Sequence, residues 1–130
     1  MKPSLRSTVY RVGDGMFLIT VGGLATWIMH LVHETGWGFV TCALGGMAAA
    51  MLAQMLLAWA VAPLLGSIES MVPSMIVGML TPMLICGLHL SGCELGGAAP
   101  AALGAAGGLT LFALLELYGE ACRRALRPAP

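Results

Sequence analysis

The positions of the charged residues constrain this chain more than any other feature, because they leave four long stretches without Asp, Glu, Lys or Arg. These stretches contain 19, 34, 24 and 21 residues, and Glu34, Glu69 and Glu94 separate them. A charge at the centre of a bilayer is costly, so helices that span a membrane largely exclude charged side chains. About 20 helical residues cross the hydrocarbon core. Each stretch can therefore hold one spanning helix.

The composition agrees with this interpretation. Of the 130 residues, 58% are hydrophobic and only 9% are charged, which is far from the balance of a soluble domain. We expect an all-α fold, a polytopic integral membrane protein in which a four-transmembrane-helix bundle makes a single membrane domain of residues 1–130. The helices are expected at Gly15 to Leu31, Phe39 to Leu65, Met71 to Leu90 and Pro100 to Leu117.

The basic residues predict the orientation. All six lie in the two tails, namely Lys2, Arg6, Arg11, Arg123, Arg124 and Arg127. Lys and Arg that flank spanning helices are retained in the cytoplasm, and an even number of spans returns the chain to the side where it began. We expect a multi-pass protein of the inner (plasma) membrane with both termini cytoplasmic. Its first partner is the lipid bilayer, and a net charge of zero argues against nucleic acid.

Glycine and polar residues mark the expected joins and one packing motif. Turns are predicted at residues 33–36, 66–70 and 91–94, where Gly, Ser, Thr and Glu interrupt the apolar sequence. Gly104 and Gly108 have the small-xxx-small spacing that lets two helix backbones approach closely. We therefore expect the fourth helix to pack tightly through this pair.

Sulfur is unusually frequent in the middle of the chain. The third expected helix has a methionine at every fourth position, namely Met71, Met75, Met79 and Met83, and the second repeats the pattern with Met47, Met51 and Met55. A step of four residues rotates only about 40° around a helix, so each set forms a row. Cys86 and His89 fall in the same sector of the third helix as Met71, Met75, Met79 and Met83. Gln54 lies within the second row and should face the protein interior, which predicts that the two rows face each other inside the bundle.

Imidazole and thiol groups gather at the end of the bundle that should face away from the cytoplasm. These residues, with two acids, are His30, His33, Glu34, Cys42, Cys86, His89, Cys93 and Glu94, while Asp14, Glu69, Glu116 and Glu120 are expected at the opposite end. Thioether and thiolate ligands suit Cu(I) and similar soft cations. The hypothesis is a protein that binds or conducts a soft metal ion, copper before silver or mercury. Its outer ligands are His30, His33, His89 and Cys93, with Cys86 below them, and the methionine rows line its path.

A short segment resembles the eukaryotic high-affinity copper transporters, which carry M-x-x-x-M followed by G-x-x-x-G in a spanning helix. Here Met75 and Met79 are followed, after twelve intervening residues, by Gly92 and Gly96. The resemblance covers about twenty residues, and that family has three spans where four are expected here. It implies that stacked thioethers can conduct a copper ion.

Other interpretations remain open at this stage. The methionine rows also fit ordinary core packing, and Cys42 and Cys93 would share one face for a disulfide. His30 or His33 with His89 could ligate the iron of a b-type haem, which would make the chain an electron-transfer subunit. A non-catalytic accessory or assembly subunit of a larger membrane complex, or a homo-oligomer, also fits the glycine-rich helices. No hydrolase, phosphate-loop or zinc-protease motif is present, so an enzyme is not expected.

Overall fold

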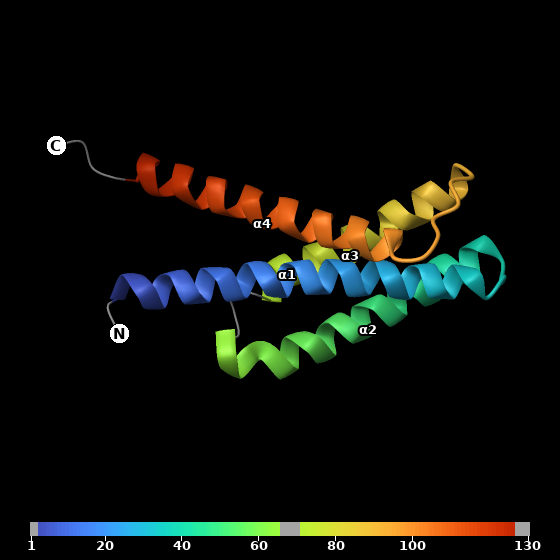
Figure 1. Cartoon of the computed structure of the whole chain (residues 1–130), viewed down its shortest axis with the longest axis horizontal. Coiled ribbons are helices and arrows are strands. Elements are labelled where there is room, and N and C mark those ends of the chain that lie inside the picture. Colours follow the sequence, from blue (N-terminus) through green and yellow to red (C-terminus); the bar gives the residue numbers. More distant parts are fainter. Residues whose placement is uncertain (1–2, 66–70, 127–130) are drawn as a thin grey trace.

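Four helices, each antiparallel to the one before it, make up the part of this protein that the structure describes. The computed structural model describes residues 3–65 and 71–126, and its helices are α1 (Pro3–Glu34), α2 (Phe39–Leu65), α3 (Met71–Leu90) and α4 (Ala99–Ala125) (Figure 1). Each contains a segment long and apolar enough to cross a membrane. The predicted all-α four-helix bundle with four potential spans is therefore confirmed.

The two middle helices have the bounds expected from the sequence, whereas the first and last helices are longer than expected. α2 and α3 have the expected limits, whereas α1 begins at Pro3 and α4 continues to Ala125. A charged residue excludes a segment from the hydrocarbon but does not end a helix, since Arg and Glu are good helix formers. The charge-free windows therefore delimit the apolar spans rather than the helices. The turn predicted at residues 66–70 lies outside the described residues.

α1 is the central helix of the bundle. It contacts α2, α3 and α4, while α2 and α4 do not touch each other within the described residues. Figure 1 shows α4 and α2 on opposite sides of α1, with α3 behind it, and the two chain termini at the same end. Val21, Ala25 and Met29 of α1 are almost completely buried. α1 therefore supplies much of the interior that any site inside this bundle must use.

The tightest packing joins α1 to α4 through glycines. Gly104 and Gly108 are both buried, and a methyl group built on either would collide with the backbone oxygen of Gly22 or Leu18. The two backbones are thus in direct contact, as the small-xxx-small spacing predicts. The hydroxyl of Thr26 also lies against Gly104 and donates to the carbonyl of Gly22 at 2.9 Å. This interface fixes the position of α1 beside α4.

The expected inward orientation of the third helix's methionines is wrong for the single subunit. Met71, Met75, Met79 and Met83 are 44–57% exposed on the outer surface of α3. The face of α3 that packs inward consists of shorter or branched side chains, namely Ser74, Val77, Gly78, Thr81, Pro82 and Ile85. Small residues allow close helix contact, and a row of long thioethers would hold the helices apart. Packing therefore selects the face without methionine.

The methionines of α2 also do not form an interior row. Met55 is exposed, Met47 and Met51 are half-buried, and none of the three is among the buried core residues. Gln54 does face the interior, as predicted, where its amide lies against Gly78 and 3.5 Å from the Ser74 hydroxyl. The two methionine rows therefore do not face each other inside the subunit.

Candidate functional site

Three histidines from two helices meet at the end of the bundle opposite the termini. His30 and His33 lie one turn apart on α1, and His89 lies near the end of α3, which runs parallel to α1. The ring of His89 is 4.7 Å from that of His33 and 5.8 Å from that of His30, measured between ring centroids. The structure thus brings together all the histidines of the chain. We call these three residues with Cys86 and Met29 the histidine cluster.

Hydrogen bonds fix the tautomer of two of these rings. Nδ1 of His33 lies 2.9 Å from the backbone oxygen of Met29, and Nδ1 of His89 lies 3.0 Å from that of Ile85. A carbonyl only accepts, so Nδ1 carries the proton and donates it in both residues. The lone pair of a neutral ring is then on Nε2. This is the arrangement that orients metal-binding histidines in proteins.

His30 has the opposite arrangement. Its side chain is buried, and Nε2 lies 3.3 Å from the Glu34 carboxylate one helical turn further on. Within the described residues, Nδ1 is buried and has no hydrogen-bond partner. When Nε2–H donates to the carboxylate, the Nδ1 lone pair is left facing the protein interior without a donor. An unsatisfied buried acceptor costs about 1–3 kcal/mol, so this nitrogen is suited to a ligand.

Two sulfur atoms complete the cluster. Sγ of Cys86 lies 3.6 Å from Sδ of Met29 and 3.9 Å from Nε2 of His33. Met29 is fully buried, and it fits because Gly46 of α2 has no side chain where the thioether lies. The sequence prediction missed Met29, since this residue belongs to neither methionine row. Its position four residues before His33, on the same face of one helix, is the signal that could have revealed it.

A cavity of about 530 Å³ opens beside the cluster. His30, Glu34 and His89 line it from α1 and α3, and the α3–α4 loop lines it with Gly92, Cys93, Glu94, Leu95 and Gly96. Cys93 is exposed, so it stands at the mouth of the cavity rather than within the cluster. The loop begins after Leu90, as expected, and Gly92 adopts a positive φ of 79° there.

Cys42 lies near the start of α2 and is not among the described residues that line this cavity. Cys42 is buried, and its thiol is 3.1 Å from the backbone oxygen of Trp37 and 3.4 Å from that of Val32. It thereby ties the start of α2 to the turn that follows α1. All four cysteines of the chain are free, so the Cys42 to Cys93 disulfide considered from the sequence is not formed.

The cluster has donors but not yet a closed coordination sphere. In the part of the chain that the structure describes, no group of three or more His, Cys, Asp or Glu side chains is arranged to hold a metal ion as it stands. The rings of His33 and His89 instead contact each other at an interplanar angle of 32°. This contact leaves no space between them for a porphyrin, which a shared haem iron would require.

Comparisons of the chain with protein-family models, with curated proteins and with solved structures found no match. A functional interpretation therefore depends on the geometry and chemistry of the chain itself.

Proposed function

We propose that this protein binds a soft monovalent metal ion, copper(I) first and silver(I) next, at the histidine cluster, and passes it across the inner membrane. The observation that carries the proposal is the grouping of three imidazole rings, with the Cys86 thiol beside His33 and the Met29 thioether beside Cys86. Imidazole nitrogen, thiol sulfur and thioether sulfur together form a donor set that favours soft, thiophilic ions over Mg²⁺ or Ca²⁺.

The lone pairs support this assignment. His33 and His89 each use Nδ1 for a backbone carbonyl and keep Nε2, whereas His30 uses Nε2 for a carboxylate and keeps Nδ1. Each ring therefore retains one nitrogen for a ligand. The cavity lined by His30 and His89 gives an ion a route from water, with the exposed Cys93 as the first sulfur that it meets.

The positive-inside rule indicates on which side of the membrane the site lies. Arg11, Arg123 and Arg124 lie at the end that carries both termini, so we assign that end to the cytoplasm and the histidine cluster to the opposite side. Since the α3 methionines are on the outer surface, they would line a path only between subunits. We therefore assign metal binding to the single subunit and conduction along Met71, Met75, Met79 and Met83 to a homo-oligomer.

Metal binding by the purified, detergent-solubilised protein tests the first part. The test is titration of Cu(I) against a coloured chelator, with metal analysis and a visible spectrum of the same sample. Met29→Leu removes the thioether while keeping a similar volume, and His89→Gln removes one imidazole. We expect each change to weaken Cu(I) binding by about tenfold or more, the lower end of what the loss of even a supporting group costs a metal site.

The matched control is Met79→Leu, the same chemical change on the outer surface of α3. It should leave the Cu(I) affinity of the subunit unchanged. Equal binding by the native protein, Met29→Leu and His89→Gln would contradict the proposal. A Soret band would favour haem instead, and a colourless, metal-free protein that does not take up Cu(I) would leave an accessory subunit.

The conduction part has its own test. Vesicles with reconstituted protein should accumulate Ag(I), and Met75→Leu with Met79→Leu should slow accumulation at equal protein level and unchanged Cu(I) affinity in detergent. Unchanged accumulation in the double variant would show that the α3 row is not a path.

A further inference from the structure

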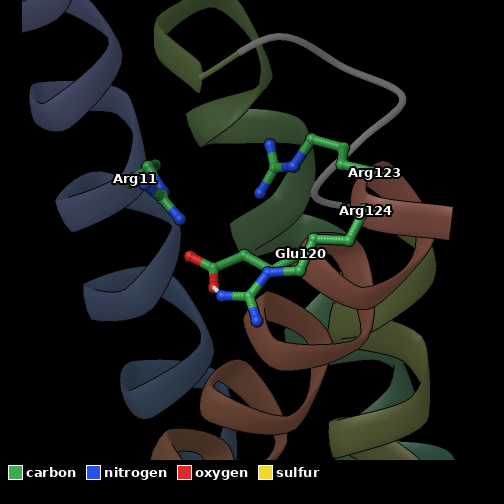
Figure 2. Close-up of a pocket in the computed structure, with 4 residues that line it drawn as sticks. All are labelled: Arg11, Glu120, Arg123 and Arg124. Atoms are coloured by element: carbon green, nitrogen blue, oxygen red, sulfur yellow. Dashed lines mark ion pairs between the residues drawn. The ribbon is translucent and has the colours of Figure 1, made fainter. Parts of the chain in front are cut away.

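The end of the bundle opposite the histidine cluster contains a second polar site. There α1 and α4 diverge enough to leave a cavity of about 390 Å³ lined by Arg11, Glu120, Arg123 and Arg124. Figure 2 shows the guanidinium groups of Arg11 and Arg123 directed into this space from different helices, with the Glu120 carboxylate between α4 and Arg11. Among the described residues, three cations and one anion therefore surround one opening.

The ion pairs at this end leave one arginine without an acidic partner among the described residues. Arg11 forms a two-nitrogen contact with Glu116, in which Nε lies 3.0 Å from Oε1. Arg124 is paired with Glu120 at 3.6 Å, and both side chains are well exposed. Among the ion pairs of the described residues, none includes Arg123. Glu116 and Glu120, expected from the sequence at this end, thus neutralise Arg11 and Arg124 and leave the Arg123 guanidinium to attract an anion.

An apolar cavity adjoins the polar one. It measures about 310 Å³ and is lined by Thr8, Arg11, Val12, Phe112 and Glu116, so Arg11 is common to both cavities. Val12 is exposed, and Phe112 is half-buried against Gly15 of α1. A molecule that fits both spaces has an anionic group next to an apolar chain. This is the chemistry of a phospholipid whose phosphate lies at the membrane surface.

We propose that the Arg123 guanidinium, beside the ion-paired Arg11 and Arg124, binds the phosphate of an anionic phospholipid, with the start of its acyl chain against Val12 and Phe112. Arginine suits a phosphate because its planar group donates two parallel hydrogen bonds. Arg11 lies near the start of α1, and Arg123 and Arg124 lie near the end of α4. A bilayer that covers the apolar middle of these helices would place its headgroups beside the site. Clusters of Arg next to spanning helices attract anionic lipids.

The test uses the full-length protein in neutral phosphatidylcholine nanodiscs that contain a small fraction of phosphatidylglycerol. Phosphatidylglycerol retained after transfer to detergent is measured by native mass spectrometry. We expect Arg123→Gln to reduce retention about fivefold, the effect of one basic residue near a membrane surface. Arg123→Lys should restore only part of it, since the charge stays but the paired donors are lost. Glu120→Gln should increase retention.

Two further arms make the result decisive. Thr35→Glu lowers the net charge by the same amount at the opposite end of the bundle and alters none of the residues that line the cavity, so it should retain more lipid than Arg123→Gln. Inorganic phosphate at millimolar concentration should not displace the lipid. Equal retention by the native protein and Arg123→Gln, or equal loss in Arg123→Gln and Thr35→Glu, would overturn the proposal. Displacement by inorganic phosphate alone would replace the lipid with a soluble phosphate.

Discussion

Single side chains show how polar groups are accommodated inside this apolar bundle. The side chain of Gln54 is buried between α2 and α3, and within the described residues its Oε1 has no hydrogen-bond partner. This oxygen fits because it lies against Gly78, which has no side chain. A methyl group at that position would push the amide away from Ser74. The absence of a side chain at Gly78 thus determines how closely these two helices approach.

We therefore expect Gly78→Ala to destabilise the bundle by about 1–3 kcal/mol, the usual effect of adding a methyl group to a filled interior. Helix loss in increasing sodium dodecyl sulfate, followed by circular dichroism, measures the change. Gly87→Ala is the control on the same helix, since Gly87 is exposed and nothing lies within 4 Å of the added methyl. Equal stability of the two variants would show that Gln54 adapts without cost.

The residues of the histidine cluster also show what sequence can and cannot predict. His30, His33 and His89 were expected at one end from helix spacing and topology, because parallel helices place equivalent positions at equal depth. Met29 was not, because its role depends on the space that Gly46 leaves on another helix. Helix spacing does place Met29 on the same face as His33, but the space that admits its side chain is a property of packing between helices, which the sequence of one helix does not contain.

The length and apolarity of each helix were predictable from the sequence. Which face of a helix packs inside the bundle was harder to predict. From Met71 to Met83, every fourth residue of α3 is methionine, and these residues form one face of the helix. The residues between them include glycine and serine and form a second face with a similar helical period, so either face could have packed inward. The one with small residues packs inward, since lipid accepts methionine as readily as the interior does, whereas close helix contact requires small side chains. Hydrophobic periodicity alone does not distinguish lipid from core.

The α1–α4 interface gives a prediction for whole helices. Gly104 and Gly108 bring the backbone of α4 against α1, so Gly108→Leu should force α4 outward and destabilise the fold by at least about 1–3 kcal/mol. The same detergent titration measures it. Gly119→Leu is the matched control on α4, because among the described residues a Cβ added there meets only the Arg123 guanidinium, at 4.0 Å. If both variants unfold alike, the glycine contact is not what holds α4 in place.

The whole molecule has two chemically different ends. Arg11, Arg123 and Arg124 lie with both termini at one end, and the histidine cluster lies at the other. This polarity follows from sequence because an even number of spans and the positive-inside rule act together. It gives the two proposed sites separate environments: a soft ion would enter from the outer side, while an anionic lipid would be held at the cytoplasmic surface.

Labelling of intact cells tests this polarity. Cys93 is exposed in the loop between α3 and α4, whereas Cys42 is buried and Cys86 is half-buried. A thiol reagent that cannot cross the inner membrane should therefore modify the native protein from the outer side. Cys93→Ser should abolish this modification, and Cys122→Ser, near the opposite end, should leave it unchanged. If labelling from outside depends on Cys122 instead, the bundle is inverted, and the histidine cluster would then receive ions from the cytoplasm and the arginine site would face the outer leaflet.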